Sequence, residues 1–197
     1  MKQEQVKELL IQSLEHERGG IQVYETALKC VLNDDLKEEW TKYLDQTRNH
    51  ERILTGVFQQ LSLDPNEDSP GRRVVKSLGL SLVEAMQLAL KAGKPEAAEL
   101  VACECVVLAE TKDHADWELI SKCAEKSSGK QKSVLQAAAD EVEEQEDEHL
   151  YHSKGWCREL WLQSLGMTAV LPPPEERKHV TTAIGAARAE QASEKGR

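Results

Sequence analysis

The sequence predicts an all-α protein built around a four-helix bundle. Four long segments have no internal proline and carry apolar residues at helical spacing, and clusters of turn-forming residues separate them. Aromatic residues make up only 4% of the 197 residues, which argues against an all-β sandwich. With 40% hydrophobic and 30% charged residues, the chain suits one domain of ordinary size followed by a modest tail.

The first two predicted helices follow one another closely. Residues 2–32 form one long helix, on which apolar residues such as Val6, Leu10 and Tyr24 recur at helical spacing. The sequence Asn33-Asp34-Asp35 is predicted to be a turn that contains a capping residue. The second helix then begins at Leu36 and ends near Leu63-Asp64-Pro65.

A connecting segment precedes two further long helices. Its first part is a loop by composition, its second part is a shorter amphipathic helix, and the two long helices then follow with a Ser-Ser-Gly-Lys turn between them; these elements are expected at residues 65–71, 78–92, 94–124 and 131–165. This order predicts a four-helix bundle with one long crossover, which is the arrangement of ferritin-like folds.

The predicted bundle occupies residues 1–166, and the rest of the chain differs in character. Residues 167–197 contain the sequence Leu171-Pro172-Pro173-Pro174 and then become small and polar. We expect this segment to be a C-terminal arm or tail rather than a second domain.

The charge and the cysteines restrict the classes of function. Lys and Arg sum to 25 and Asp and Glu to 35, so the formal net charge is −10, and we expect no nucleic-acid partner. No secretion signal and no stretch of 18 uncharged apolar residues is found, so the chain is predicted to be cytoplasmic and not to enter a membrane. The five cysteines are an odd number at spacings that fit neither a zinc ribbon nor a disulfide framework, so they are expected to be reduced core residues.

Some acidic residues share the apolar faces of the predicted helices. When residues are placed about 100° apart around each helix axis, Glu17 falls at the centre of the apolar face of the first helix. On the second helix Thr47 falls at the centre, Glu51 lies close beside it and His50 lies at the flank. A charge at such a position is costly unless it is paired or binds a metal, so these residues are candidate ligands.

The fourth helix carries the clearest pair of candidates. Glu146 and His149 both fall on its apolar face, and their three-residue spacing lets a carboxylate and an imidazole reach one metal ion. The third helix is apolar nearly all round. Its apolar residues favour Glu104, whereas the level of Glu146 in the bundle favours Glu110 or His114.

The candidate metal ligands are therefore Glu17, His50, Glu51, Glu104, Glu146 and His149. An oxygen-rich set with one or two imidazoles suits Fe or Mn better than Zn, so we expect one or two Fe or Mn ions. Two-metal carboxylate bundles use Glu from two helices and Glu-x-x-His from the other two. Here Leu54 stands where the second histidine is expected, and salt bridges from the acids to nearby arginines are the alternative.

The segment Leu44–Arg52 (Leu-Asp-Gln-Thr-Arg-Asn-His-Glu-Arg), with the following Phe58 and Ser62-Leu63-Asp64-Pro65, resembles a signature of ferritin-like stress proteins of the YciE/YciF type. More distantly it resembles rubrerythrins and bacterioferritins. Glu17, Glu104 and Glu146 stand about where that family has acids in its first, third and fourth helices. The resemblance spans roughly Leu9 to Leu150 and implies the ferritin-like fold more firmly than it implies a function.

The chain also departs from that family. Gln46 and Gln145 stand where the family usually has Glu, and Cys105-Val106-Val107 replaces the usual His-Tyr-Glu after the acid of the third helix. Together with Leu54, the two Gln residues favour a metal-free structural or stress-related protein with a decayed site.

We therefore expect a metal-binding protein that oxidises Fe(II) or handles peroxide, with the metal-free protein as the alternative. An oxygenase that acts on an organic substrate would use the same ligands. Apolar residues expected outside the seam of the bundle predict a homodimer; they are Val106, Trp117, Ile120 and Trp161.

Overall fold

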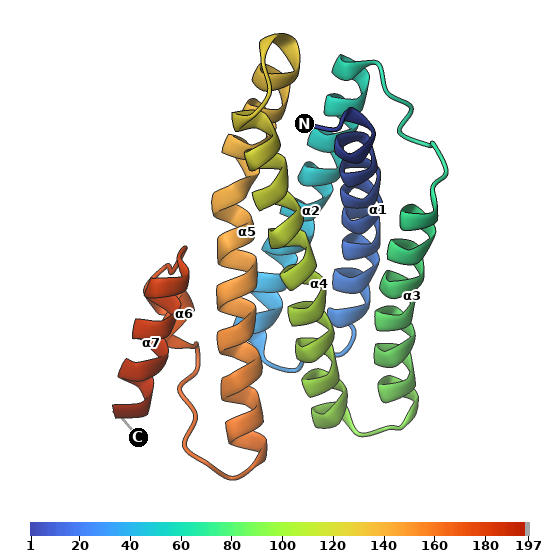
Figure 1. Cartoon of the computed structure of the whole chain (residues 1–197). Coiled ribbons are helices and arrows are strands. Elements are labelled where there is room, and N and C mark those ends of the chain that lie inside the picture. Colours follow the sequence, from blue (N-terminus) through green and yellow to red (C-terminus); the bar gives the residue numbers. More distant parts are fainter. Residues whose placement is uncertain (196–197) are drawn as a thin grey trace.

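The computed structural model describes residues 1–195, and within this range the protein is all-helical, as expected (Figure 1). Its seven helices are α1 (Gln3–Ala27), α2 (Asp34–Leu61), α3 (Pro70–Lys91), α4 (Pro95–Glu125), α5 (Gly129–Ser164), α6 (Pro174–Arg177) and α7 (Ala183–Lys195). None of the helices in the described part of the chain combines the length and the apolar composition that a membrane span requires.

Four long helices pack around a common interior. Helix α1 contacts α2 and α4, and α5 contacts the same two helices, so the four form a closed ring (Figure 1). Neighbours in the ring are antiparallel: Lys42 of α2 pairs with Glu148 of α5, while the later His50 of α2 contacts the earlier Gln145 of α5. Each of the four therefore presents one face to the same interior.

Polar side chains fix the turn between α1 and α2. The side chain of Asn33 accepts a hydrogen bond from the backbone N–H of Leu36, which confirms the expected cap. The Glu99 carboxylate of α4 accepts hydrogen bonds from the backbone N–H groups of Leu32 and Asn33. This turn is thus tied to α4 as well as to its own helix.

The connecting segment is more helical than the sequence predicted. Helix α3 begins at Pro70 rather than near residue 78, because the Ser69 hydroxyl caps its first turn and Pro is tolerated there. Arg72 then donates to Glu15 of α1 over 2.8 Å. Two adjacent arginines interrupt the apolar pattern in this turn, so its periodicity becomes visible only from Val74 onward. Helix α3 packs outside the ring against α1 and α4.

The buried apolar residues form two clusters at opposite ends of the ring. One contains Tyr24, Trp40 and Trp156, and the other contains Phe58 and Trp117. Between them, each of the four helices buries polar residues instead. The interior is therefore a polar layer enclosed by two apolar ones.

The predicted dimer face is largely inside the molecule. Val106, Trp117 and Ile120 are fully buried within the chain, and of the four residues only Trp161 is exposed. Helix α4 lies between three other helices, so apolar residues on several of its sides are covered by the chain itself.

The segment after residue 166 is anchored to α5. Helices α6 and α7 both contact α5. Arg158 of α5 donates to both oxygens of Glu175 at 2.8 and 3.0 Å and to the neighbouring Glu159 at 3.0 Å. Both carboxylates are buried. The predicted arm is thus partly helical, and its division from the bundle as a separate unit stays a prediction.

Replacing Arg158 with Ala should loosen this anchor, because it removes the cation that donates to both oxygens of the buried Glu175 carboxylate. The expected loss in the free energy of unfolding is about 3–5 kcal/mol, the usual effect of breaking a buried ion pair. Thermal unfolding and limited proteolysis after residue 166 measure it. Arg48→Ala is the control, because its ion pairs are about half exposed and should contribute at most about 1 kcal/mol. Equal effects of the two variants would contradict the prediction.

Candidate metal centre

The polar layer contains two groups of buried side chains that could hold a metal ion. Glu17, His50 and Glu146 form one group, and Glu110, Glu146 and His149 form the other. Within each group the ligand atoms all lie within 4.8 Å of one another. Glu146 belongs to both groups, and the five residues come from all four helices of the ring.

Both histidines are held by hydrogen bonds on their outer side. His50 Nε2 donates to the side-chain carbonyl of Gln145 over 2.9 Å, and His149 Nε2 donates to that of Gln46 over the same distance. A hydrogen bond at one ring nitrogen fixes the tautomer and directs the other nitrogen elsewhere. Here Nδ1 of each ring therefore faces the interior.

Two of the carboxylates are held in the same way. Trp117 Nε1 donates to Glu17 Oε1 over 2.8 Å, and the Tyr24 hydroxyl donates to Glu110 Oε1 over 2.7 Å. Each of these bonds engages one carboxylate oxygen and leaves the second one buried without a hydrogen-bond partner. In each of these four residues, the two histidines and the two glutamates, one polar atom is hydrogen-bonded and the other is not.

The inner atoms have no hydrogen-bond partner. They are Glu17 Oε2, His50 Nδ1, Glu110 Oε2, His149 Nδ1 and both carboxylate oxygens of Glu146. His50 Nδ1 lies 2.9 Å from Glu146 Oε1 without the alignment of a hydrogen bond. Two lone pairs that face each other at this distance repel, and either a proton on Nδ1 or a cation between the two atoms removes the repulsion. Buried polar atoms without partners are rare, so their convergence makes this layer a candidate cation site.

The electrostatics of the layer favour protons on several of its buried groups. Burial opposes the charge of His149, but the carboxylates of Glu146 and Glu110 outweigh it and raise the pKa of His149 to about 9. Burial and the charge of Glu146 raise the pKa of Glu17 well above its usual value, and they do the same to the pKa of the nearby Asp113. His149, Glu17 and Asp113 therefore retain protons to a higher pH than usual, and a metal ion that binds to these groups would have to displace those protons.

The ligands and their outer partners repeat between the two halves of the chain. The aromatic residue seven positions after Glu17 is Tyr24, and it holds the Glu110 carboxylate; the residue seven positions after Glu110 is Trp117, and it holds Glu17. Likewise Gln46 precedes His50 by four positions, as Gln145 precedes His149, and each Gln holds the histidine of the other helix.

The two halves also differ at the centre of the site. Thr47 stands three residues before His50, at the position that Glu146 takes before His149. The Thr47 hydroxyl donates to the backbone carbonyl of Tyr43, one turn earlier in α2. The layer thus has one central glutamate instead of two, while Asp113 adds a further buried carboxylate from α4.

Four of the six candidate ligands from the sequence meet in this layer: Glu17, His50, Glu146 and His149. Glu51 does not, because the adjacent His50 takes the inward position and Glu51 turns to Arg18, 3.2 Å away. Glu104 is exposed and accepts a hydrogen bond from Trp161.

On α4 the alternatives resolve to Glu110. His114 lies outside the two groups and pairs with Asp147 over 3.4 Å. Sequence reasoning did not recognise Gln46, Gln145 and Trp117 as partners of the ligands. The Gln-x-x-x-His repeat is the signal that could have identified the two Gln residues.

Comparisons of the chain with models of known protein families, with curated proteins and with solved structures found no match.

The metal-free protein should lose stability as the pH rises from about 6.5 to about 9. The pKa of His149 is 6.5 when unperturbed and about 9 in the folded protein, so its contribution is complete below pH 6.5 and is lost as the pH passes 9. The raised pKa of Glu17 acts in the same direction, because folding favours the protonated acid. Denaturant unfolding at several pH values in the presence of a chelator measures this.

His149→Gln should flatten that dependence, whereas His114→Gln should leave it in place, because His114 lies outside both ligand groups. A free energy of unfolding that stays constant or increases over this range in the metal-free wild type would contradict the prediction.

Proposed function

We propose that this protein is a ferritin-like four-helix bundle that binds one or two Fe or Mn ions in its polar layer. The convergence of six buried, unpartnered N and O atoms from all four helices is the observation that carries the proposal. Two-metal carboxylate bundles use Glu from two helices and Glu-x-x-His from the other two. This chain supplies Glu17, Glu110 and Glu146-x-x-His149 in that pattern, with His50 alone from the remaining helix.

The two ligand groups define two ion positions. Glu17 and His50 would hold one ion, Glu110 and His149 would hold the other, and Glu146 would be shared between them. Three carboxylates and two imidazoles are hard and intermediate ligands, which suit Fe or Mn better than a thiolate-preferring structural Zn site. Because thiolates are absent from both groups, the five free cysteines take no part.

The chemistry that such ions supply is one-electron exchange with oxygen or peroxide, as in the oxidation of Fe(II). The residues of the chain would position the ions and determine how much water reaches them. Tyr24, Trp117 and the two Gln residues hold the ligands in place, and the apolar clusters on both sides limit access of water to the layer. Buried carboxylates favour the higher positive charge of an oxidised ion.

The alternative is a metal-free structural or stress-related dimer. Thr47 supports it, because this residue replaces the second central glutamate of the two-metal pattern. In that case the layer would be held by protons alone, among them the proton that the raised pKa of His149 retains. A dimeric state and a cytoplasmic location are predictions under either function.

Metal loading under anaerobic Fe(II) or Mn(II) separates the two functions. Wild-type protein without a histidine tag should retain one to two ions per chain, and Glu146→Ala should retain none, because both ion positions use Glu146. Elemental analysis after gel filtration measures the content. Glu51→Ala and Glu104→Ala are matched controls that should load like the wild type, since both side chains lie outside the layer.

Less than about 0.2 ions per chain in the wild type would contradict the proposal, because a folded metal site loads stoichiometrically. A content that does not change in Glu146→Ala would also contradict it.

Gln46→Leu and Gln145→Leu should each weaken metal binding by about 10- to 100-fold, the usual effect of removing the partner that orients a ligand. The reason is that each substitution frees one imidazole to rotate and to lose its tautomer. Competition with a chelator gives the affinities, and circular dichroism confirms the fold. Gln136→Leu, on the exposed side of α5, is the control. Unchanged affinity in both Gln variants would show that the histidines are not ligands.

A further inference from the structure

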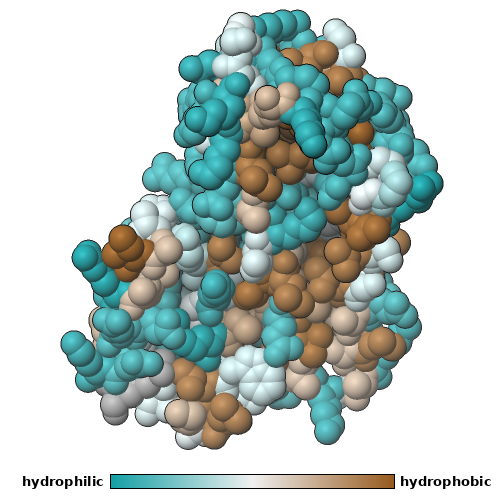
Figure 2. Space-filling view, in the orientation of Figure 1, coloured by the Kyte–Doolittle hydropathy of each residue, from teal (hydrophilic) through white to brown (hydrophobic). Residues whose placement is uncertain are grey.

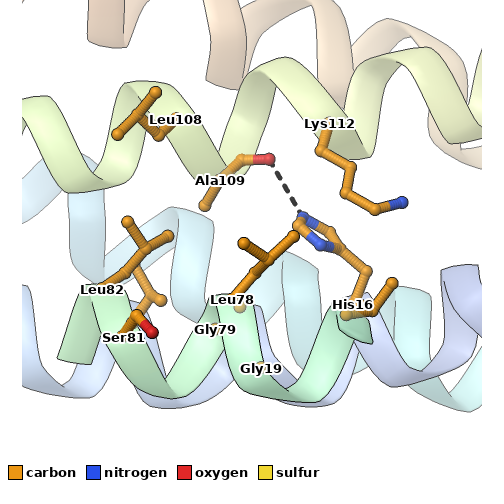
Figure 3. A pocket seen from close by; sticks show the side chains of 12 residues that line it. His16, Gly19, Leu78, Gly79, Ser81, Leu82, Leu108, Ala109 and Lys112 are labelled. Carbon is orange, nitrogen blue, oxygen red and sulfur yellow. Dashed lines mark hydrogen bonds between the residues drawn. The ribbon is translucent and has the colours of Figure 1, made fainter. Parts of the chain in front are cut away.

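A cavity of about 280 Å³ opens between α1, α3 and α4, outside the ring that holds the metal centre (Figure 3). Its lining is almost entirely apolar. Leu78 and Leu82 of α3 form one wall and Leu108 of α4 forms the opposite one. The polar groups at its edge are His16, Lys112 and Ser81.

Glycines of two helices meet beside the cavity. Gly19 and Gly20 of α1 and Gly79 of α3 all line the cavity. A Cβ atom on Gly79 would lie 3.5 Å from the Cα of Gly19, which is ordinary van der Waals contact. The backbones of α1 and α3 therefore approach each other closely at this pair of glycines. The volume beside them is not filled by side chains, whereas protein interiors rarely leave such volume unfilled.

The entrance is apolar as well. Leu78 is 55% exposed and Leu108 is 61% exposed, and both line the cavity. Hydrophobic residues also gather on the face of the molecule over α3 and α4 (Figure 2). Exposed apolar residues that surround a concave apolar site are typical of a binding site. The chain as a whole carries a net charge of −10, but few charged residues line this cavity.

One cation lies at the edge of this cavity. Lys112 Nζ bonds to Asp116 over 2.6 Å, which uses one of its three N–H groups and leaves two for another acceptor. His16 does not compete for that role, because its Nε2 donates to the backbone carbonyl of Ala109 (Figure 3). An anionic group at the edge would therefore meet the two remaining N–H groups of Lys112, next to the Asp116 carboxylate with which this ammonium is paired.

We propose that this cavity binds the hydrocarbon chain of a medium-chain carboxylic acid, with the carboxylate at Lys112. A cavity of 150 Å³ holds one benzene ring, so about 280 Å³ corresponds to a chain of roughly ten carbons. The apolar lining takes the chain, and the ammonium group selects an anionic end over a neutral one. This inference does not rest on the proposed metal centre. The candidate metal ligands lie inside the ring of four helices, whereas the cavity lies outside it, next to α3.

Decanoate binding to the purified full chain tests the proposal, by calorimetry below the micellar concentration with and without a chelator. Wild type should bind one decanoate per chain. Leu78→Glu should weaken binding at least tenfold, because it places a carboxylate at the apolar entrance. Leu80→Glu is the matched control: Leu80 is 50% exposed on the same helix but does not line the cavity, so binding should not change.

Lys112→Gln should weaken the binding of decanoate several-fold and leave that of decanol unchanged. Equal effects on both ligands would overturn the assignment of the carboxylate to Lys112. The site itself would be overturned if the wild type shows no saturable binding, or if Leu78→Glu and Leu80→Glu weaken binding equally. Sedimentation gives a further check. If Leu78→Glu converts a dimer to a monomer and the wild type does not bind decanoate, the occupant is a second copy of the chain.

Discussion

The carboxylate of Glu146 is the constraint around which the polar layer is organised. It is fully buried, and the imidazoles of His50 and His149 face it with Nδ1 2.9 and 3.4 Å from its Oε1. Burial alone would keep such a group neutral, yet the charges of His149 and His50 lower its pKa below the usual value. A buried negative charge of this kind requires cations, and the competition between protons and metal ions follows from it.

The residues around Glu146 are held by hydrogen bonds between the two halves of the chain. Each half provides a glutamate, an aromatic donor and a Gln-x-x-x-His pair, and each donor serves the other half. A shift of α1, α2, α4 or α5 would therefore disturb a candidate ligand on a neighbouring helix. The apolar clusters on either side add rigidity, because close-packed side chains resist such shifts.

The sequence predicted those parts of the site that local geometry determines. Glu17, Glu146 and His149 could be placed because their helices have one clear apolar face. Helix α4 is covered by α1, α3 and α5, so its apolar residues point in several directions. From the sequence they favoured Glu104, and only the level of Glu146 in the bundle favoured Glu110 or His114. The roles of Gln46 and Gln145 depend on which helices become neighbours. Viewed along the chain alone, these residues indicated loss of the site, whereas in space they orient its histidines.

Helix α1 joins the two binding regions that the structure suggests. Glu17 faces the polar layer, while His16 and Gly19 on the same turns face the cavity beside α3. Gly20 touches both regions: it lines the cavity, and a Cβ atom there would approach the Thr47 side chain to 3.3 Å. Unfilled volume and buried unpaired charge both reduce the stability of a folded chain. Ligands that bind only the folded state offset both costs, so occupancy of either region would stabilise the same helix.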